Sequence, residues 1–115
     1  MGQDAFRRDP ITSTFADDPE MKELIGLFIQ ELPQRVAALE QAWNSADLGS
    51  LRRLAHQLKG SAAGFGFESI GIAAGELESP LRDRPVQSDA LDGVEHQFRE
   101  LVALCSHAVA GVRHT

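Results

Sequence analysis

The sequence predicts an all-α fold, most simply an antiparallel up-and-down four-helix bundle with a short N-terminal arm or helix. Apolar residues recur at steps of three and four, strong start and stop signals separate the periodic segments, and no segment shows strand-like alternation beside turn residues. With 115 residues the chain is about one domain long. We expect an arm over residues 1–17, contacting the body through Ile11 and Phe15, and a bundle over residues 18–115.

The first long helix is expected to begin after Asp18, because this residue is a good cap and Pro19 and Glu20 suit the first turn. Its apolar face continues for about 24 residues. Pro33 interrupts this stretch, and since the stripe keeps its phase across the proline we expect a kink rather than two helices. The stripe comprises Met21, Leu24, Ile25, Phe28, Ile29, Leu32, Val36, Leu39 and Trp43.

A second helix is expected from about Leu48 to Phe65, with Asp47 as its cap and Gly64-Phe65-Gly66 as its stop signal. One face of this helix is apolar, so it should pack into the bundle. The apolar positions are Leu51, Leu54, Ala55, Leu58, Ala62 and Phe65.

Two further helices complete the predicted bundle. The third runs from about Glu68 to Ser79, and Gly71 and Gly75 on it would allow close packing against a neighbour. Residues 80–88 contain two prolines and are expected to form a solvated loop. The last helix covers about residues 89–111. The apolar positions are Ile70, Ala73, Ala74 and Leu77 on the third helix, and Leu91, Val94, Phe98, Leu101, Cys105, Ala108 and Val112 on the last.

The charge distribution singles out one segment. The formal net charge of -6 argues against nucleic acid and anionic membranes as partners, because both would repel the chain. Residues 48–67 nevertheless contain no acidic residue. This segment holds four residues that are basic or can become so, namely Arg52, Arg53, His56 and Lys59.

The expected location is the cytoplasm. The single cysteine, Cys105, lies in an apolar stripe and reads as a small core residue in a reducing compartment. The sequence has neither a run of 18 apolar residues nor a basic leader followed by an apolar segment.

The candidate functional residues lie together on the second helix. At 100° per residue, His56 points to the water side, and Lys59 lies one turn later. Gly60 beside them is unfavourable in a helix interior by about 1 kcal/mol relative to Ala, and its missing side chain leaves room for a partner. Ser61 and Gly64 follow on the same helix, and the spacing of all five residues is meaningful only if they act together as one helical motif.

This arrangement resembles the H-x-x-K-G-S motif of histidine-containing phosphotransfer (HPt) domains, followed by a further small residue. The motif corresponds here to His56, Lys59, Gly60 and Ser61, with Gly64 as the small residue. The resemblance extends along most of the chain and implies an antiparallel four-helix bundle. It also implies that His56 accepts a phosphoryl group from the aspartyl phosphate of one receiver domain and passes it to another.

The resemblance implies a role for each motif residue. His56 is the nucleophile, Lys59 contacts the phosphoryl oxygens, and Ser61 orients the ring or Lys59 through a hydrogen bond. Gly60 gives clearance for the receiver, and Gly64 permits close packing of a neighbouring helix or of the partner. Arg52 and Arg53 supply electrostatic support for partner binding.

We therefore expect a monomeric phosphocarrier rather than an enzyme, since the sequence has no phosphate-binding glycine-rich loop of a nucleotide site. Its partners would be response-regulator receiver domains, including those of hybrid histidine kinases. No cofactor is expected, and any magnesium would be carried by the receiver.

Two alternatives stay open. A helical adaptor could dock a receiver or another partner through the basic face without being phosphorylated. A metal-dependent enzyme in a helical bundle would need Glu-x-x-His pairs, and His56 has none in the sequence. His96 and His107 are about 16 Å apart on one helix and are expected to face solvent.

Overall fold

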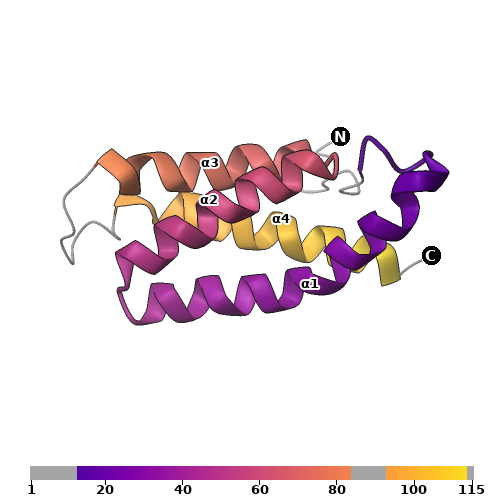
Figure 1. Cartoon of the computed structure of the whole chain (residues 1–115). Coiled ribbons are helices and arrows are strands. Elements are labelled where there is room, and N and C mark those ends of the chain that lie inside the picture. Colours follow the sequence, from indigo (N-terminus) through magenta and orange to yellow (C-terminus); the bar gives the residue numbers. More distant parts are fainter. Residues whose placement is uncertain (1–12, 84–92, 114–115) are drawn as a thin grey trace, which may run out of the picture.

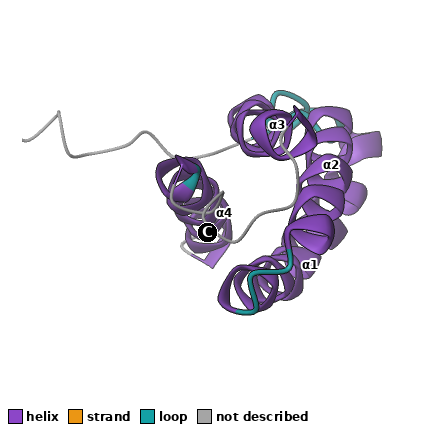
Figure 2. Ribbon diagram, turned by 90° about the vertical axis from the view of Figure 1, so that its left-hand side faces the viewer, coloured by secondary structure: helices purple, strands orange, loops and turns teal. Residues whose placement is uncertain are grey.

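Four antiparallel helices form the bundle. A computed structural model of the chain describes residues 13–83 and 93–113 (Figure 1). Each helix packs on the next in sequence, and the fourth also packs on the first, so that the helices close a ring (Figure 2). This confirms the predicted all-α up-and-down bundle, and the described part contains no strand. The helices are α1 (Pro19–Asn44), α2 (Leu48–Gly64), α3 (Glu68–Asp83) and α4 (Glu95–Arg113).

The start of α1 follows the sequence signals. Asp18 caps it by accepting a hydrogen bond from the backbone N–H of Glu20 at 2.9 Å. The helix continues through Pro33 and bends between its indigo and purple parts in Figure 1. Its apolar stripe is buried only from Phe28 onward. Leu24 is 45% exposed, so the first turns of α1 lie at the edge of the core.

The turn between α2 and α3 is fixed by a glycine and by the chain that precedes α1. Gly66 has a φ of 82°, in the left-handed region that favours glycine. Its carbonyl accepts a hydrogen bond from the N–H of Thr14 at 2.9 Å, and the Ser13 hydroxyl donates to the carbonyl of Phe65. The arm therefore contacts the body through buried Ser13. Phe15 also contacts this turn, as expected, because its Cδ2 lies 2.9 Å from the position that a Cβ at Gly66 would take, although the side chain is 40% exposed. Ile11 lies outside the described residues.

The ends of α3 and α4 differ from the prediction. α3 does not end at Ser79 but continues through Pro80 to Asp83, because buried Leu81 extends the apolar stripe by one more turn. α4 begins at Glu95, with Gly93 before it, so the start expected near residue 89 is wrong. Residues 84–92, most of the expected loop, lie outside the described part, as do Leu91 and the side chain of Val112.

The core is aliphatic in the middle and aromatic at two places. Phe28 of α1 lies 5.2 Å from Phe65 and 5.4 Å from Phe67 by ring centroids, which ties α1 to the α2–α3 turn. Trp43 stacks on Phe98 of α4 at 4.3 Å. Each fully buried aliphatic side chain contributes about 1.5–3 kcal/mol to the bundle. The largest fully buried side chains are Leu32, Leu39, Leu51, Leu58, Ile70, Leu77, Val94, Leu101 and Cys105.

Candidate functional site

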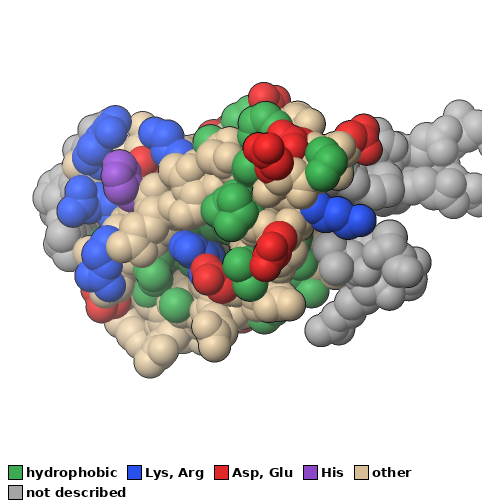
Figure 3. Space-filling view, turned by 45° about the vertical axis from the view of Figure 1, so that its right-hand side comes forward, with side chains coloured by type: hydrophobic (Ala, Val, Ile, Leu, Met, Phe, Trp, Pro, Cys, Tyr) green, Lys and Arg blue, Asp and Glu red, His purple; other side chains and the backbone are tan. Residues whose placement is uncertain are grey.

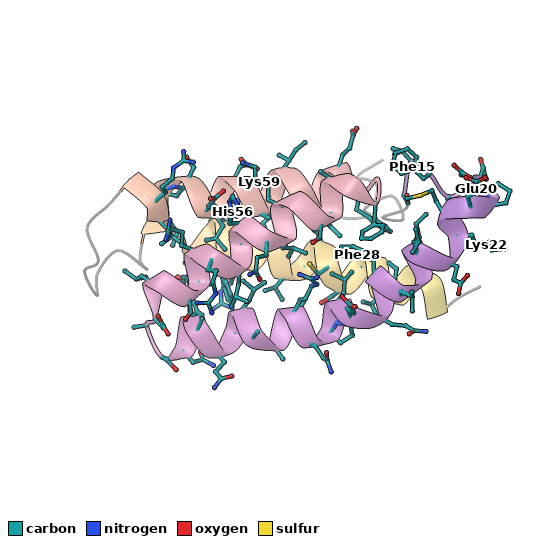
Figure 4. The ribbon with its side chains drawn as sticks, in the orientation of Figure 1. Phe15, Glu20, Lys22, Phe28, His56 and Lys59 are labelled. Atoms are coloured by element: carbon teal, nitrogen blue, oxygen red, sulfur yellow. The ribbon has the colours of Figure 1, made fainter. Side chains whose placement is uncertain are left out.

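His56 lies on the outer face of α2, where its side chain is 69% exposed. The neighbouring residues Ala55 and Leu58 are fully buried, so the helix holds the histidine firmly while the ring stands in solvent. Figure 4 shows His56 and Lys59 on the edge of α2 that faces α3. The orientation predicted from the helical period is therefore the one observed.

A buried carboxylate from α3 reaches the ring. Nδ1 of His56 lies 2.8 Å from Oε2 of Glu78, whose side chain is only 5% exposed. An ionised carboxylate offers only acceptors, so Nδ1 carries the hydrogen and donates it. The unshared electron pair of the neutral ring then lies on Nε2, the other ring nitrogen.

The same carboxylate holds Lys59 in a looser pair. Nζ of Lys59 lies 3.7 Å from Oε1 of Glu78, which is an ion-pair distance rather than a hydrogen bond. The aliphatic part of Lys59 passes over Gly75 of α3, where a Cβ would come within 3.4 Å of Cδ. Because Gly75 has no side chain, the lysine can pass over α3 at this position and approach Glu78.

The electrostatics of Glu78 favour its ionised form. Burial acts to raise the pKa of this carboxyl group, but the hydrogen bond from His56 and the charges of His56, Lys59 and Arg82 outweigh it and lower the pKa. Glu78 is consequently an anion at neutral pH. The buried negative charge of Glu78 therefore interacts with His56 and Lys59 of α2 and with Arg82 of α3.

Basic side chains surround this site on the surface. Arg52 and Arg53 of α2 and Arg82 of α3 are all exposed. Figure 3 shows Lys and Arg side chains gathered around a histidine at one end of the molecule, while acidic side chains lie mainly toward the other end. The basic segment expected from the sequence is therefore supplemented by an arginine that belongs to α3.

The remaining motif residues behave differently from one another. A Cβ at Gly60 would meet nothing within 4 Å, which agrees with the expected clearance. A Cβ at Gly64 would also meet nothing within that distance, so Gly64 does not serve close packing of a neighbouring helix. The Ser61 hydroxyl forms no hydrogen bond with His56 or Lys59 over the described residues. The positioning contact expected from Ser61 is made instead by Glu78.

Other residues with possible chemistry are separate from this site. No group of three or more His, Cys, Asp or Glu residues in the described segments is placed to hold a metal ion. His96 and His107 are exposed on α4, as expected. Cys105 is fully buried, and burial raises the pKa of its thiol to about 12.

Comparison with known proteins identifies the class of this chain. The family model of the Hpt domain matches residues 23–110, which include all of α2 and α3. The chain therefore belongs to the Hpt domain family, whose role is histidine phosphotransfer in phosphorelays of two-component signalling. Hpt domains are phosphocarriers without kinase activity, and they interact with receiver domains. No curated protein and no solved structure matches the chain.

None of the four helices, over the residues that the structure describes, has an apolar stretch of the length that a bilayer crossing requires.

Glu78 and Arg82 are the residues that the sequence analysis missed. Nothing in the sequence singled out Glu78, and Arg82 falls in the segment 80–88 that was expected to form a loop. A signal for Glu78 was present, since Ile70, Ala74, Leu77 and Leu81 define the apolar stripe of α3 and Glu78 follows Leu77 directly at its border. Only the packing of α3 on α2 shows that this border meets His56.

Proposed function

We propose that His56 carries a phosphoryl group between the aspartates of two receiver domains. The observation that carries this proposal is the hydrogen bond between Nδ1 of His56 and Glu78, because it leaves Nε2 as the free nucleophile on an exposed ring. The chemistry needs an in-line nucleophile and positive charge for the phosphoryl oxygens, and both lie at this site.

In the accepting step, Nε2 attacks the phosphorus of the aspartyl phosphate. The P–N bond forms while the bond from phosphorus to the aspartate oxygen breaks, and the aspartate leaves as a carboxylate. The proton on Nδ1 stays in place, so the phosphorylated ring becomes cationic beside Glu78. The donating step is the reverse, with a receiver aspartate as the nucleophile: the P–N bond breaks, its electron pair returns to Nε2, and the ring leaves as a neutral imidazole with its hydrogen still on Nδ1.

Lys59 is the cation that we assign to the phosphoryl oxygens. Its side chain is 51% exposed and its pair with Glu78 is 3.7 Å long, so the ammonium group is free to turn toward a new anion. Arg52, Arg53 and Arg82 add positive potential for an acidic partner surface.

The partners in this proposal are response-regulator receiver domains, including those attached to histidine kinases. The carrier acts in the cytoplasm as a monomer and needs no cofactor of its own. Magnesium, where the transfer requires it, belongs to the acidic pocket of the receiver, since an acidic pocket is the environment that this cation prefers.

The test is transfer from receiver domains that have been phosphorylated with acetyl phosphate and Mg²⁺. Wild type should gain an acid-labile phosphoryl group, and His56→Gln should gain none while keeping its helical circular dichroism. His96→Gln, an exposed histidine on α4, is the matched control and should be labelled like wild type. Labelling of His56→Gln would remove His56 from this role.

The same experiment separates the proposal from a helical adaptor. An adaptor would bind receivers through the basic face and retain no phosphoryl group on any residue. Binding without label in wild type would therefore favour the adaptor.

A further inference from the structure

The first turns of α1 extend past two of the other helices. α1 has 26 residues, whereas α2 has 17 and α3 has 16. At 1.5 Å per residue α1 is therefore longer than either of them by about 14 Å. Figure 1 shows the indigo start of α1 beyond the ends of α2 and α3. This part of the helix has less of the bundle to pack against than the part that begins at buried Phe28.

Large apolar side chains are exposed at this end of the molecule. Leu24 is 45% exposed and Leu27 is 50% exposed, and Phe15 lies just before the helix with 40% of its surface exposed. In the part of the chain that the structure describes, Ile72 is the one other large hydrophobic residue that is exposed. An exposed apolar cluster with a polar rim is typical of a protein interaction site.

Acidic side chains accompany the two leucines. Glu20 lies one turn before Leu24 on the surface of α1. Glu23 lies one turn before Leu27 in the same way, and both carboxylates are exposed. Residues 17–23 contain four acidic residues and one lysine. These two glutamates and two leucines together form a surface that we call the α1 patch.

We propose that the α1 patch docks a basic amphipathic helix of a partner protein that is not the receiver. The patch is remote from the phosphotransfer site, since Figure 4 shows Glu20 at one end of the bundle and His56 and Lys59 toward the other. A helix bound at the α1 patch would hold the protein and leave the ring of His56 open to solvent. The inference concerns binding alone and does not depend on phosphoryl transfer.

The charges of the patch define the occupant. Two apolar side chains one turn apart on the docking helix would cover Leu24 and Leu27, and lysine or arginine beside them would pair with Glu20 and Glu23. A second copy of this chain would bring the same carboxylates against the patch and is disfavoured by like-charge repulsion. Anionic lipids and nucleic acids are repelled for the same reason.

The test uses the full chain and a synthetic helical peptide with leucines on one face and lysines on the other. The same peptide with glutamate in place of every lysine is the control. Amide chemical shifts in NMR spectra locate the bound peptide, and fluorescence anisotropy gives its Kd. The lysine peptide should shift amides of α1 at the patch and leave those of residues 52–60 unchanged, with an affinity that falls as salt rises. The glutamate peptide should not bind.

Substitutions separate the apolar part of the contact from the charged part. Leu24→Gln combined with Leu27→Gln should weaken binding of the lysine peptide about tenfold, because the apolar surface of the contact is lost. Ala37→Gln, at an exposed position of α1 outside the patch, should bind like wild type. Glu23→Gln should weaken binding about two- to fourfold, whereas Glu40→Gln, an exposed control on the same helix, should not. If circular dichroism shows that the double variant is unfolded, Leu27→Gln alone takes its place.

Three results would overturn the inference. Equal binding of the peptide to wild type and to the leucine variant would show that charge alone attracts it. Shifts centred on His56, or spread over acidic residues throughout the chain, would place the peptide elsewhere. A dimer of the free chain that Leu24→Gln and Leu27→Gln dissociate in sedimentation would show that a second copy covers the patch. A failure of His56 to accept a phosphoryl group would instead contradict only the proposed function, because docking at the patch requires no phosphoryl group.

Discussion

Oε2 of Glu78 lies 2.8 Å from Nδ1 of His56, although the two residues are 22 positions apart in the chain. The carboxylate of Glu78 is buried and the ring of His56 is exposed, so a side chain held inside the bundle orients a side chain that stands in solvent. Such second partners of a reacting histidine fix its tautomer and ring orientation. The contact also makes α3 part of the site, although the recognisable motif lies entirely on α2.

Glu78→Gln should slow phosphoryl transfer to His56 by about 10–100-fold, by analogy with the loss of the carboxylate that orients a metal-binding histidine. The amide keeps the size of the side chain but carries no charge to stabilise the cationic phosphorylated ring. Nitrogen NMR of the ring should show a larger share of the tautomer with hydrogen on Nε2. Glu76→Gln, on an exposed position of the same helix, is the control. Equal rates for both variants would contradict the role of Glu78.

Glu78 should also make stability depend on pH. The folded-state pKa of Glu78 lies below its ordinary value of 4.5, so the unfolded chain binds this proton more readily. The stabilisation is fully present above the unfolded pKa and is lost as the pH falls through the lower folded pKa. Urea unfolding should show wild type more stable than Glu78→Gln at pH 7, with a difference that shrinks below about pH 4.5. A stability difference between wild type and Glu78→Gln that grows on acidification would contradict a lowered pKa of Glu78 in the folded state.

Lys59→Met should slow transfer by about tenfold or more, because removal of a group that stabilises developing charge typically costs at least this much. Methionine keeps an apolar stem over Gly75, so circular dichroism and the unfolding midpoint should stay close to wild type. Lys59→Arg restores a cation and should recover part of the rate. An unchanged rate for Lys59→Met would show that the lysine is a bystander.

Gly66→Ala should destabilise the bundle by about 1–3 kcal/mol. Its φ of 82° is unfavourable for alanine, and a Cβ would lie 2.6 Å from the Ser13 hydroxyl oxygen and 2.7 Å from that of Thr14. Gly26→Ala is the control, because a Cβ there meets nothing within 4 Å and the substitution should stabilise α1 by about 0.5–1 kcal/mol. Urea denaturation measures both. A Gly66→Ala protein as stable as wild type would show that Ser13 and Thr14 can move away from the new Cβ without a loss of unfolding free energy.

Sequence patterns predicted the features that are local. Asp18 and Asp47 cap the helices expected of them, because a cap depends on residues within one turn. The exposure of His56 followed from the period of α2 alone. Pro80 was misread because a proline is a local break signal, whereas the burial of Leu81 that carries the helix past it is a tertiary effect. Glu78 was missed for the same kind of reason, since its partner lies on another helix.

An imidazole with 69% of its surface open to water has no wall of its own to keep water away from a group attached to it. The persistence of a phosphorylated His56 would therefore depend on the intrinsic durability of the P–N bond, and on how soon a receiver arrives. Glu78 of the bundle fixes one side of the ring, and the binding of a receiver at the other side would determine when the phosphoryl group leaves His56.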